Sequence, residues 1–348
     1  MDRRLFLSST LSTAAVTRAS HSPLGIAFLG GGHSHAVAKV RLTLKSPEWN
    51  LIGMWEDDPK VRERYKKGGR NAPDGIRFAS RDELLADKNV QVVAVESGVQ
   101  NHAQHALWAL EAGKHVHLEK PPAVDIESFR QVVRLAEKKK LLLQMGYMWR
   151  FHPGINRILE AARQGWLGDV FLVRAVINTN VKPPSRHAMA RLHGGIMFEL
   201  GAHVIDPIAR LMGRADRVTP FIRRSGVHTD QLSDNTAAVL EYPGAMAIVS
   251  SASLQPNAHW HRSFEVLGTK GAAYLYPIER ETRLEIDLAE QAGPYQAGRQ
   301  VVNLPPYKRY LGEFSEMLNS VRKGEPLSVT PSEDLVVHET LVRAADMA

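Results

Sequence analysis

The fold is decided by the stretch GIAFLGGGHSHAVAKV, residues 25–40, in which a short apolar segment leads into three glycines and an apolar-periodic segment. This order of strand, turn and helix is that of the dinucleotide-binding fingerprint G-x-G-x-x-G. Gly30 and Gly32 fill its first two glycine positions, which serve the tight turn and the approach of a pyrophosphate. His35 stands at the third position, which serves helix packing. We therefore predict a nucleotide site whose helix either lies farther from the strand or turns its imidazole into the cleft, where His33 or His35 could reach the pyrophosphate.

An acidic stretch after the second apolar segment strengthens the nucleotide prediction. Glu56 lies about 20 residues past the turn, where an acid would hydrogen-bond the adenosine ribose. It begins the run Glu56-Asp57-Asp58, which would repel the 2′-phosphate of NADP. We therefore expect NAD as the cofactor and weaker binding of NADP. Asp58 is expected to cap the helix that follows, and Ser34 to cap the helix after the glycines.

The first half of the chain alternates short apolar runs with helix-like segments, which is typical of a doubly wound α/β fold. The apolar runs do not alternate with polar residues, as expected for a parallel sheet buried on both faces. We expect strands at 26–29, 51–55, 76–79, 91–95, 115–118 and 141–146. We expect helices at 36–44, 60–67, 81–86, 102–112 and 126–139.

After about residue 150 the pattern changes to a series of strands joined by short turns, which indicates an antiparallel or mixed sheet. We expect strands at 170–178, 218–224, 237–242, 245–252, 264–267 and 273–276, and helices at 155–164, 196–211, 310–323 and 332–346. The predicted domains are a Rossmann domain of residues 23–147 and a second α/β domain of residues 148–348, whose last helices pack back on the first.

The composition excludes several classes of protein. The chain has 348 residues and a formal net charge of +7, with no block of basic residues beyond Lys138–Lys140, so no nucleic-acid partner is expected. It has no cysteine, which excludes disulfides, thiolate metal sites and a cysteine nucleophile. No apolar run is long enough to span a bilayer.

The N-terminal stretch MDRRLFLSSTLSTAAVTRAS, residues 1–20, resembles a twin-arginine export signal. Arg3 and Arg4 precede a weakly apolar core, and small residues follow near Ala19. We therefore interpret residues 1–22 as a signal peptide and expect a periplasmic protein. The alternative is an unfolded N-terminus on a cytoplasmic protein.

The stretch HVHLEKPPA, residues 115–123, carries the first catalytic candidates. Glu119 and Lys120 come at the carboxyl end of an expected strand, where ligands bind in open α/β sheets. A hydride removed from a secondary alcohol leaves a hydroxyl proton that needs a base and an alkoxide that needs a donor. Lys120 is suited to either task.

The stretch GGIMFELGAHVIDP, residues 194–207, carries the remaining catalytic candidates. Glu199, His203 and Asp206 are spaced i, i+4, i+7 and would line one face of a helix. A carboxylate one turn from a histidine orients its ring and favours the charged form. Lys120 and His203 can therefore divide the roles of base and donor in either order, with Glu199 orienting His203.

These motifs, with ALEAGKHVHLEKP, GYMWRFHP and FEVLGTKGAA, resemble the glucose–fructose oxidoreductase / inositol dehydrogenase / rhizopine-catabolism (Gfo/Idh/MocA) family over residues 24–340. The resemblance implies a Rossmann domain, a C-terminal α/β domain with an open, mainly antiparallel sheet, and NAD(P)-linked chemistry on a carbinol carbon of sugars or inositols. Lys120 and His203 correspond to the family's catalytic lysine and histidine, and Glu199 stands where many members have aspartate. The resemblance also implies a homodimer or homotetramer built through the exposed sheet.

The candidate site residues fall into two groups. The resemblance places the loop after the fourth strand near the cofactor, and the stretch GYMWRFHP at the domain junction near the substrate. The cofactor-binding candidates are Gly30, Gly32, His33, Ser34, His35, Glu56, Ser97, Asn101, His102, Glu119 and Lys120. The substrate candidates are Tyr147, Arg150, Asp206 and, in a loop that could cover the substrate, His187 beside Arg186.

Several histidines stand in close pairs, which raises the question of a metal site. The pairs are His33/His35, His102/His105, His115/His117 and His259/His261. No third ligand follows any of them at a spacing characteristic of zinc sites, so we expect no metal.

The sequence predicts an oxidoreductase that transfers hydride between a secondary alcohol of a sugar or polyol and NAD. One alternative uses the same residues in an NAD-dependent glycosidase or lyase, where transient oxidation acidifies a neighbouring proton and elimination follows. A sensor of small ligands without catalysis is a third interpretation. Free NAD should be scarce outside the cytoplasm, so an exported enzyme is expected to hold its cofactor tightly.

Overall fold

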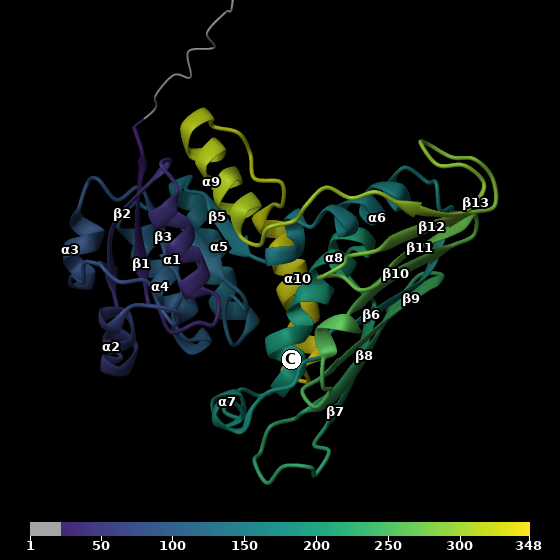
Figure 1. Ribbon diagram of the computed structural model, residues 1–348, viewed down its shortest axis with the longest axis horizontal. Helices are drawn as coiled ribbons and strands as arrows, with labels where there is room; N and C mark the ends of the chain where they lie inside the picture. Colours follow the sequence, from purple (N-terminus) through teal and green to yellow (C-terminus); the bar gives the residue numbers. More distant parts are fainter. Residues whose placement is uncertain (1–21) are drawn as a thin grey trace, which may run out of the picture.

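The computed structural model describes residues 22–348, and a parallel sheet organises their first part (Figure 1). Its strands are β1 (Leu24–Leu29), β2 (Trp49–Trp55), β3 (Val92–Val95), β4 (His115–Glu119) and β5 (Leu143–Gly146). The helices between them are α1 (Ala36–Lys45), α2 (Pro59–Lys67), α3 (Arg81–Ala86), α4 (Val99–Glu111) and α5 (Ile126–Lys139). The strands pair in the order β2-β1-β3-β4-β5, all in parallel, which confirms the predicted doubly wound sheet.

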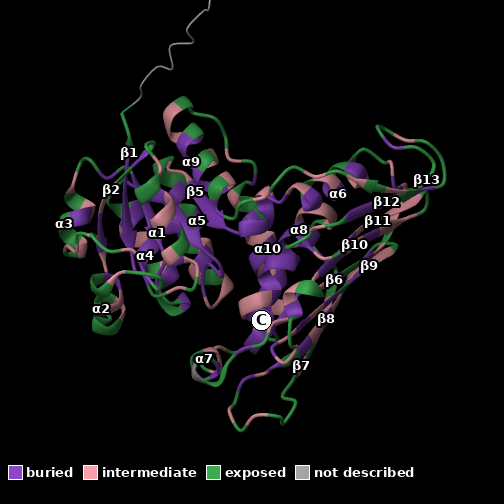
Figure 2. Cartoon of the chain, in the orientation of Figure 1, coloured by how far each residue is buried: buried purple, intermediate pink, exposed green. Residues whose placement is uncertain are grey.

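Burial explains why these short apolar runs form a parallel sheet. Every residue of β1, β3 and β5 is buried, and Figure 2 shows the strands of this sheet as a buried layer. A strand buried on both faces needs helices on both sides, which the crossovers of a doubly wound fold supply. The carboxyl ends of β3 and β4 therefore open at one edge, where Ser97 and Lys120 follow.

A second sheet, largely antiparallel, forms most of the remaining chain (Figure 1). Its strands are β6 (Val170–Val176), β7 (Arg217–Arg223), β8 (Asn235–Tyr242), β9 (Ala245–Ala252), β10 (Ser263–Gly268), β11 (Gly271–Leu275), β12 (Leu284–Leu288) and β13 (Gly298–Val302). They lie in the order β13-β12-β11-β10-β6-β9-β8-β7, and only the β6–β9 pair is parallel. The open, mainly antiparallel second sheet is thus confirmed.

The second sheet is covered on one face only. Buried positions alternate with partly or fully exposed ones along β8 and β9, as expected for a sheet with one packed and one open face. The other elements of this part are η1 (Met148–Phe151), α6 (Pro153–Arg163), α7 (Pro183–Met189), the π-helical turn η2 (Met197–Gly201), α8 (Ala202–Met212), η3 (Ala258–Trp260), α9 (Leu311–Lys323) and α10 (Pro331–Ala344). Helices α6, α8 and α10 pack on the inner face.

Helix α10 joins the two parts of the molecule, because it packs against both α8 and α5. A buried ion cluster lies at this junction. Arg150 of η1 donates from Nε and Nη2 to Oδ1 of Asp206 in α8, at 2.9 and 2.7 Å, and from Nη2 to Asp334 of α10. Buried charges are tolerated when they are paired in this way. The cluster therefore ties three elements to one guanidinium.

Several elements differ from the sequence prediction. No strand forms at 76–79 in the described chain, where Phe78 makes only an isolated bridge to Met54. Strands β12 and β13 were not predicted, although Leu284, Ile286 and Leu288 alternate with charged residues along β12. Glu285 of β12 accepts hydrogen bonds from Arg299 of β13, so cross-strand ion pairs support strands that apolar patterning did not identify. Helix α7 was also not predicted.

The expected export signal lies outside the described residues, apart from Ser22, and it stays a prediction. Within residues 22–348, no helix is both long and apolar enough to cross a membrane.

Two glycines with similar backbones test how tightly the nucleotide turn packs. Gly30 has a φ of +86°, and a Cβ there would lie 2.5 Å from Cα of Ser97, whereas Gly69 has a φ of +81° and nothing within 4 Å of its Cβ position. We expect Gly69→Ala to lower the free energy of unfolding by about 1 kcal/mol through its left-handed backbone. Gly30→Ala should lower it by about 1–3 kcal/mol more, because the added methyl collides with Ser97. Urea unfolding measures both, and equal losses would contradict the tight packing.

Candidate active site

The glycine turn leaves its backbone accessible at Gly32. Gly30 donates its N–H to the carbonyl of Trp55 at 2.8 Å and packs against Ser97, so it has no room for a side chain. Gly32 is exposed, and only Val61, at 3.8 Å, lies near the position of a Cβ. A phosphate can therefore approach the backbone there. The predicted cap by Ser34 is wrong: helix α1 begins after His35, no side chain caps it, and Ser34 is exposed.

Glu56 braces the turn from the end of β2. Its carboxylate accepts hydrogen bonds from the N–H groups of Gly31, at 2.7 Å, and Asp58, at 3.0 Å. Burial raises the pKa of Glu56, and these two N–H groups oppose the rise. Asp58 caps α2 by accepting from the N–H of Lys60 at 2.7 Å, as predicted. A surface hollow beside Glu56 is lined by Trp55, Asp57, Arg62, Phe78, Ala79, Ser80 and Glu83.

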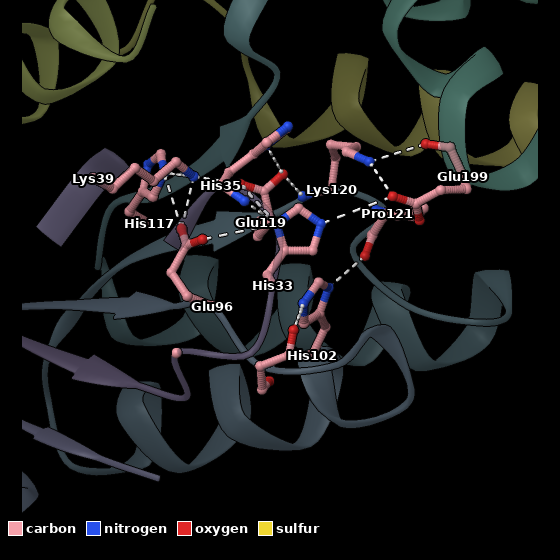
Figure 3. A network of polar contacts seen from close by, with 12 residues as sticks. His33, His35, Lys39, Glu96, His102, His117, Glu119, Lys120, Pro121 and Glu199 are labelled. Carbon is pink, nitrogen blue, oxygen red and sulfur yellow. Dashed lines mark hydrogen bonds and ion pairs between the residues drawn. The ribbon is translucent and has the colours of Figure 1, made fainter. Parts of the chain in front are cut away.

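A buried polar network lies beneath the turn, at the carboxyl ends of β3 and β4 (Figure 3). Its centre is the fully buried ammonium of Lys39 in α1. Lys39 Nζ donates to Glu96 at 2.7 Å and to Glu119, and it lies 2.8 Å from Nε2 of His117. Burial alone would raise the pKa of Glu119, but Lys39 and two nearby imidazoles hold it well below its usual range. Glu119 is therefore ionised at neutral pH.

His35 turns its imidazole into the cleft, which is one of the two orientations expected from the sequence. Its Nδ1 lies 3.2 Å from Oε1 of Glu119. The ring centroid lies 5.7 Å from that of His203 and 5.3 Å from that of Tyr310. The third position of the fingerprint therefore carries a side chain that faces the second domain rather than the first strand.

Lys120 and Glu199 meet across the two domains. Lys120 Nζ donates to Oε1 and to the backbone carbonyl of Glu199, both at 2.9 Å (Figure 3). The carbonyl belongs to the π-helical turn η2, where the regular i→i−4 hydrogen bonding is interrupted, a feature frequent at functional sites. The predicted use of Glu199 to orient His203 is therefore wrong in this geometry: η2 changes the phase of the helix, and the carboxylate binds Lys120.

His203 is a buried, neutral imidazole beside this pair. Burial lowers the pKa of His203 well below its usual value, and Lys120 and His35 lower it further. Its Nδ1 has no hydrogen-bond partner within residues 22–348. The ring centroid lies 5.6 Å from Trp149. A neutral ring has one nitrogen without a proton, and Nδ1 is open to a further partner.

Two predicted cofactor residues help to shape the cleft. His102 places Nδ1 2.6 Å from the carbonyl oxygen of Pro121 and Nε2 3.0 Å from that of Ser97, so it pins the loops after β3 and β4 together. Asn101 is exposed on the first turn of α4. The hydroxyl of Ser97 is buried and has no partner in the described chain. His102 therefore positions backbone, whereas Ser97 keeps a free hydroxyl.

The residues predicted to bind substrate make other contacts in the structure. Arg150 and Asp206 bind each other in the junction cluster, and so are not free to bind substrate. Tyr147 is buried beneath Arg150, whose guanidinium carbon lies 4.6 Å from the centroid of its ring. His187 is exposed on α7. Its neighbour Arg186 is buried and forms ion pairs with Asp230 and, at 2.8 Å, Asp234, which anchor α7 to the segment before β8.

Sequence reasoning missed four residues that contact the site: Lys39, Glu96, Trp149 and Tyr310. Lys39, Glu96 and Trp149 lie in or beside the stretches that the sequence analysis singled out, but their partners come from other elements, so spacing alone did not identify them. Lys39 carried one signal, as a charged residue on the buried face of α1.

The comparisons with known proteins agree with this architecture. Residues 24–147 match the oxidoreductase family with an NAD-binding Rossmann fold, and residues 155–274 match the GFO/IDH/MocA C-terminal domain. The chain therefore belongs to the Gfo/Idh/MocA family of oxidoreductases, as the resemblance of its motifs implied.

Relatives with named activities share low sequence identity with this chain, but the matches cover most of both proteins. Myo-inositol 2-dehydrogenase of Thermotoga maritima is 25% identical over 266 residues, which cover 74% of this chain and 77% of that protein. D-xylose 1-dehydrogenase (NADP(+)) of Hypocrea jecorina is 27% identical over 313 residues, which cover 82% of this chain and 80% of that protein. The crystal structure of GenD2 from gentamicin A biosynthesis, in complex with NAD, shares the fold, with a TM-score of 0.75 at 24% identity over 96% and 97% of the two chains.

Because of Glu313 in α9, we expect the stability of the folded chain to depend measurably on pH. Both of its carboxylate oxygens are buried without a hydrogen-bond partner in the described residues. Burial raises its pKa from 4.5 to about 7, and that of Glu96 from 4.5 to about 8, although Lys39 opposes both shifts. These two groups then bind more protons in the folded chain than in the unfolded chain, so their contribution to stability should fall as the pH rises from about 4.5 to about 8.

Glu313→Gln should remove part of that fall. At pH 8 we expect the variant to be more stable than the wild type by up to about 3 kcal/mol, and at pH 4.5 to be nearly equal to it. Urea unfolding at the two pH values measures the difference, and Glu325→Gln, exposed just after the same helix, is the control. A variant whose profile parallels the wild type would show that Glu313 is not a buried titrating group.

Proposed function

We propose that the chain transfers hydride between a secondary alcohol of a sugar or polyol and a nicotinamide cofactor held by the glycine turn. The observation that carries the proposal is the Lys120–Glu199 ion pair, with His203 and His35 beside it, at the carboxyl edge of the parallel sheet. The sugar and polyol dehydrogenases among the relatives support the substrate class.

The residues present fit a nicotinamide dinucleotide. Gly32 presents open backbone, the hollow beside Glu56 lies at the end of β2 where adenosine binds, and the buried Ser97 hydroxyl has no partner among residues 22–348. When bound, the cofactor supplies the hydride acceptor or donor. We favour NAD, because Asp57 and Asp58 add exposed negative charge beside Glu56, against the single cation of Arg62 in the hollow.

The catalytic roles follow from the state of each group. His203, neutral and buried, accepts the proton of the substrate hydroxyl. The Lys120 ammonium steadies the alkoxide that develops on the same oxygen, because a charge-assisted donor in a water-poor site is strong there. Glu199 holds Lys120 with two acceptors and so orients the ammonium group.

Lys120→Met tests these roles. The variant should keep nucleotide binding, since the glycine turn is unchanged, and lose at least about 10²-fold in kcat, because it removes the donor for the alkoxide. Mass spectrometry of nucleotide released from denatured protein reports binding, and oxidation of sugars and inositols reports turnover. Lys138→Met, exposed on the last turn of α5, is the control. Turnover of Lys120→Met at the wild-type rate on a confirmed substrate would refute the mechanism.

We also propose that the open face of the second sheet joins two copies of the chain. Phe221, Met246 and Ile248 are 45, 46 and 38% exposed, and cross-strand pairing puts them on the same face. Contiguous exposed apolar side chains mark interaction surfaces in soluble proteins. Ion pairs such as Arg174–Glu265 and Arg217–Glu241 lie on the same face.

Light scattering on the purified protein tests this assembly. We expect a dimer or tetramer for the wild type and monomers or weaker association for Ile248→Glu, because a buried unpaired charge disfavours the interface. Val227→Glu, in a loop at 71% exposure, should assemble as the wild type does. A monomeric wild type would contradict the proposal.

A further inference from the structure

A largely buried guanidinium near His203 has no role in the hydride transfer above. It belongs to Arg262, which directly precedes β10 and whose side chain is 12% exposed. Burial lowers the pKa of His203, and the charge of Arg262 adds to this fall, so the two side chains lie within electrostatic range of each other. Trp149 links them, because its ring centroid lies 5.6 Å from that of His203 and it also lies beside Glu279, the ion partner of Arg262.

The charge of Arg262 is incompletely neutralised. Its Nε donates to the backbone carbonyl of Asn178 at 3.1 Å, and its Nη1 lies 3.4 Å from Oε2 of Glu279. A guanidinium carries five N–H donors, and Nη2 of Arg262 makes no hydrogen bond within residues 22–348. Burial lowers the pKa of Arg262, and Glu279 does not fully offset the fall. A cation buried in this way favours a further anionic partner.

Glu279 cannot satisfy Arg262, because a second guanidinium shares it. Arg309 donates from Nε and Nη2 to the two carboxylate oxygens of Glu279. This bidentate arrangement is the strong form of the interaction, whereas Arg262 makes one long contact with the same carboxylate. One negative charge therefore serves two positive charges, and Arg262 is the less well paired of the two.

A hollow of about 650 Å³ opens beside Glu279. Its wall carries two guanidinium groups, Arg280 and Arg309, and two carboxylates, Glu279 and Glu281. These four charges balance one another, so the excess positive charge of the region belongs to Arg262. An anionic group that enters from this side is therefore attracted to Arg262.

We propose that Arg262 binds an anionic group of the substrate, a carboxylate or a phosphate carried by the sugar, and so makes acidic sugars the preferred substrate class. A planar guanidinium with unused N–H groups fits either oxyanion. Arg262 would determine specificity and would take no part in the transfer of hydride or proton. The inference rests on the hydride-transfer proposal, which places the reacting alcohol beside His203.

Calorimetry on the nucleotide-saturated protein tests this recognition without turnover. Glucose, galactose and mannose are each compared with the matching uronate and the matching sugar phosphate. In at least one set, an acidic member should bind at least about 10-fold more tightly than the neutral sugar, because hydrogen bonds to charged groups contribute about that much. The uronates and the phosphates separate the two sources of the negative charge.

Two variants of the ion cluster should shift this preference in opposite directions. Arg262→Gln should weaken binding of the acidic member at least about 10-fold and leave the neutral sugar nearly unchanged, since only the charged partner is lost. Glu279→Gln should strengthen binding of the acidic member, because it removes the competing carboxylate. Arg134→Gln is the matched control: Nη1 of Arg134 also makes one contact with a carboxylate, Glu127 at 3.3 Å, but its side chain is 67% exposed on α5.

Equal affinity for the acidic and neutral members of every set would overturn the proposal, and so would equal losses in Arg262→Gln and Arg134→Gln. Thermal unfolding shows whether Arg262→Gln folds. If it does not, Arg262→Lys decides, because it keeps the charge without the planar fork: reduced preference supports the proposal, and unchanged preference overturns it. Oxidation of the same sugars tests hydride transfer separately. Oxidation without any preference for acidic sugars overturns only the role of Arg262, whereas preferential binding without oxidation contradicts only hydride transfer.

Discussion

The buried ammonium of Lys39 is the interaction on which the site depends. It lies between two carboxylates that end neighbouring strands, Glu96 after β3 and Glu119 on β4. Without this cation, two like charges in a low-dielectric interior would repel each other and take up protons. Its presence keeps Glu119 charged, and the charge of Glu119 in turn attracts the imidazole of His35 into the cleft. The backbone N–H of Lys120 donates to Glu119 and that of His33 to the carbonyl of Glu96, so the cluster also contacts the loop after β4 and the end of the glycine turn.

The second domain completes the site through an irregular helix. The helix is π-helical at residues 197–201, and in this turn the carbonyl of Glu199 accepts from Lys120. The junction cluster of Arg150, Asp206 and Asp334 holds η1, α8 and α10 together beside it. Because α10 also packs on α5, the distance between Lys120 and Glu199 is set by buried contacts rather than by a flexible linker.

Sequence reasoning predicted the fold well where a signal was local. The unbroken apolar runs of β1 and β3 identified the parallel sheet, and Asp58 was recognised as a cap from its position alone. It failed where a partner came from far away in the chain. The spacing of Glu199 and His203 indicated a hydrogen bond on one helix face, but Lys120, 79 residues earlier, takes the carboxylate. Likewise, no rule of spacing could pair His35 with Glu119, 84 residues later.

The histidine at the third glycine position illustrates how a departure from a fingerprint can carry information. That position faces the helix–strand interface in the usual pattern, where only a small side chain fits closely. Here α1 still packs on the sheet, because Ala36 is fully buried at its start, and His35 is turned the other way. The side chain then meets a carboxylate, another imidazole and the second domain at once. If the side chain of His35 made no favourable contact, it would be expected to face solvent, as that of Ser34 does. The contact of the half-buried His35 with Glu119 instead makes this position part of the polar network at the end of β4.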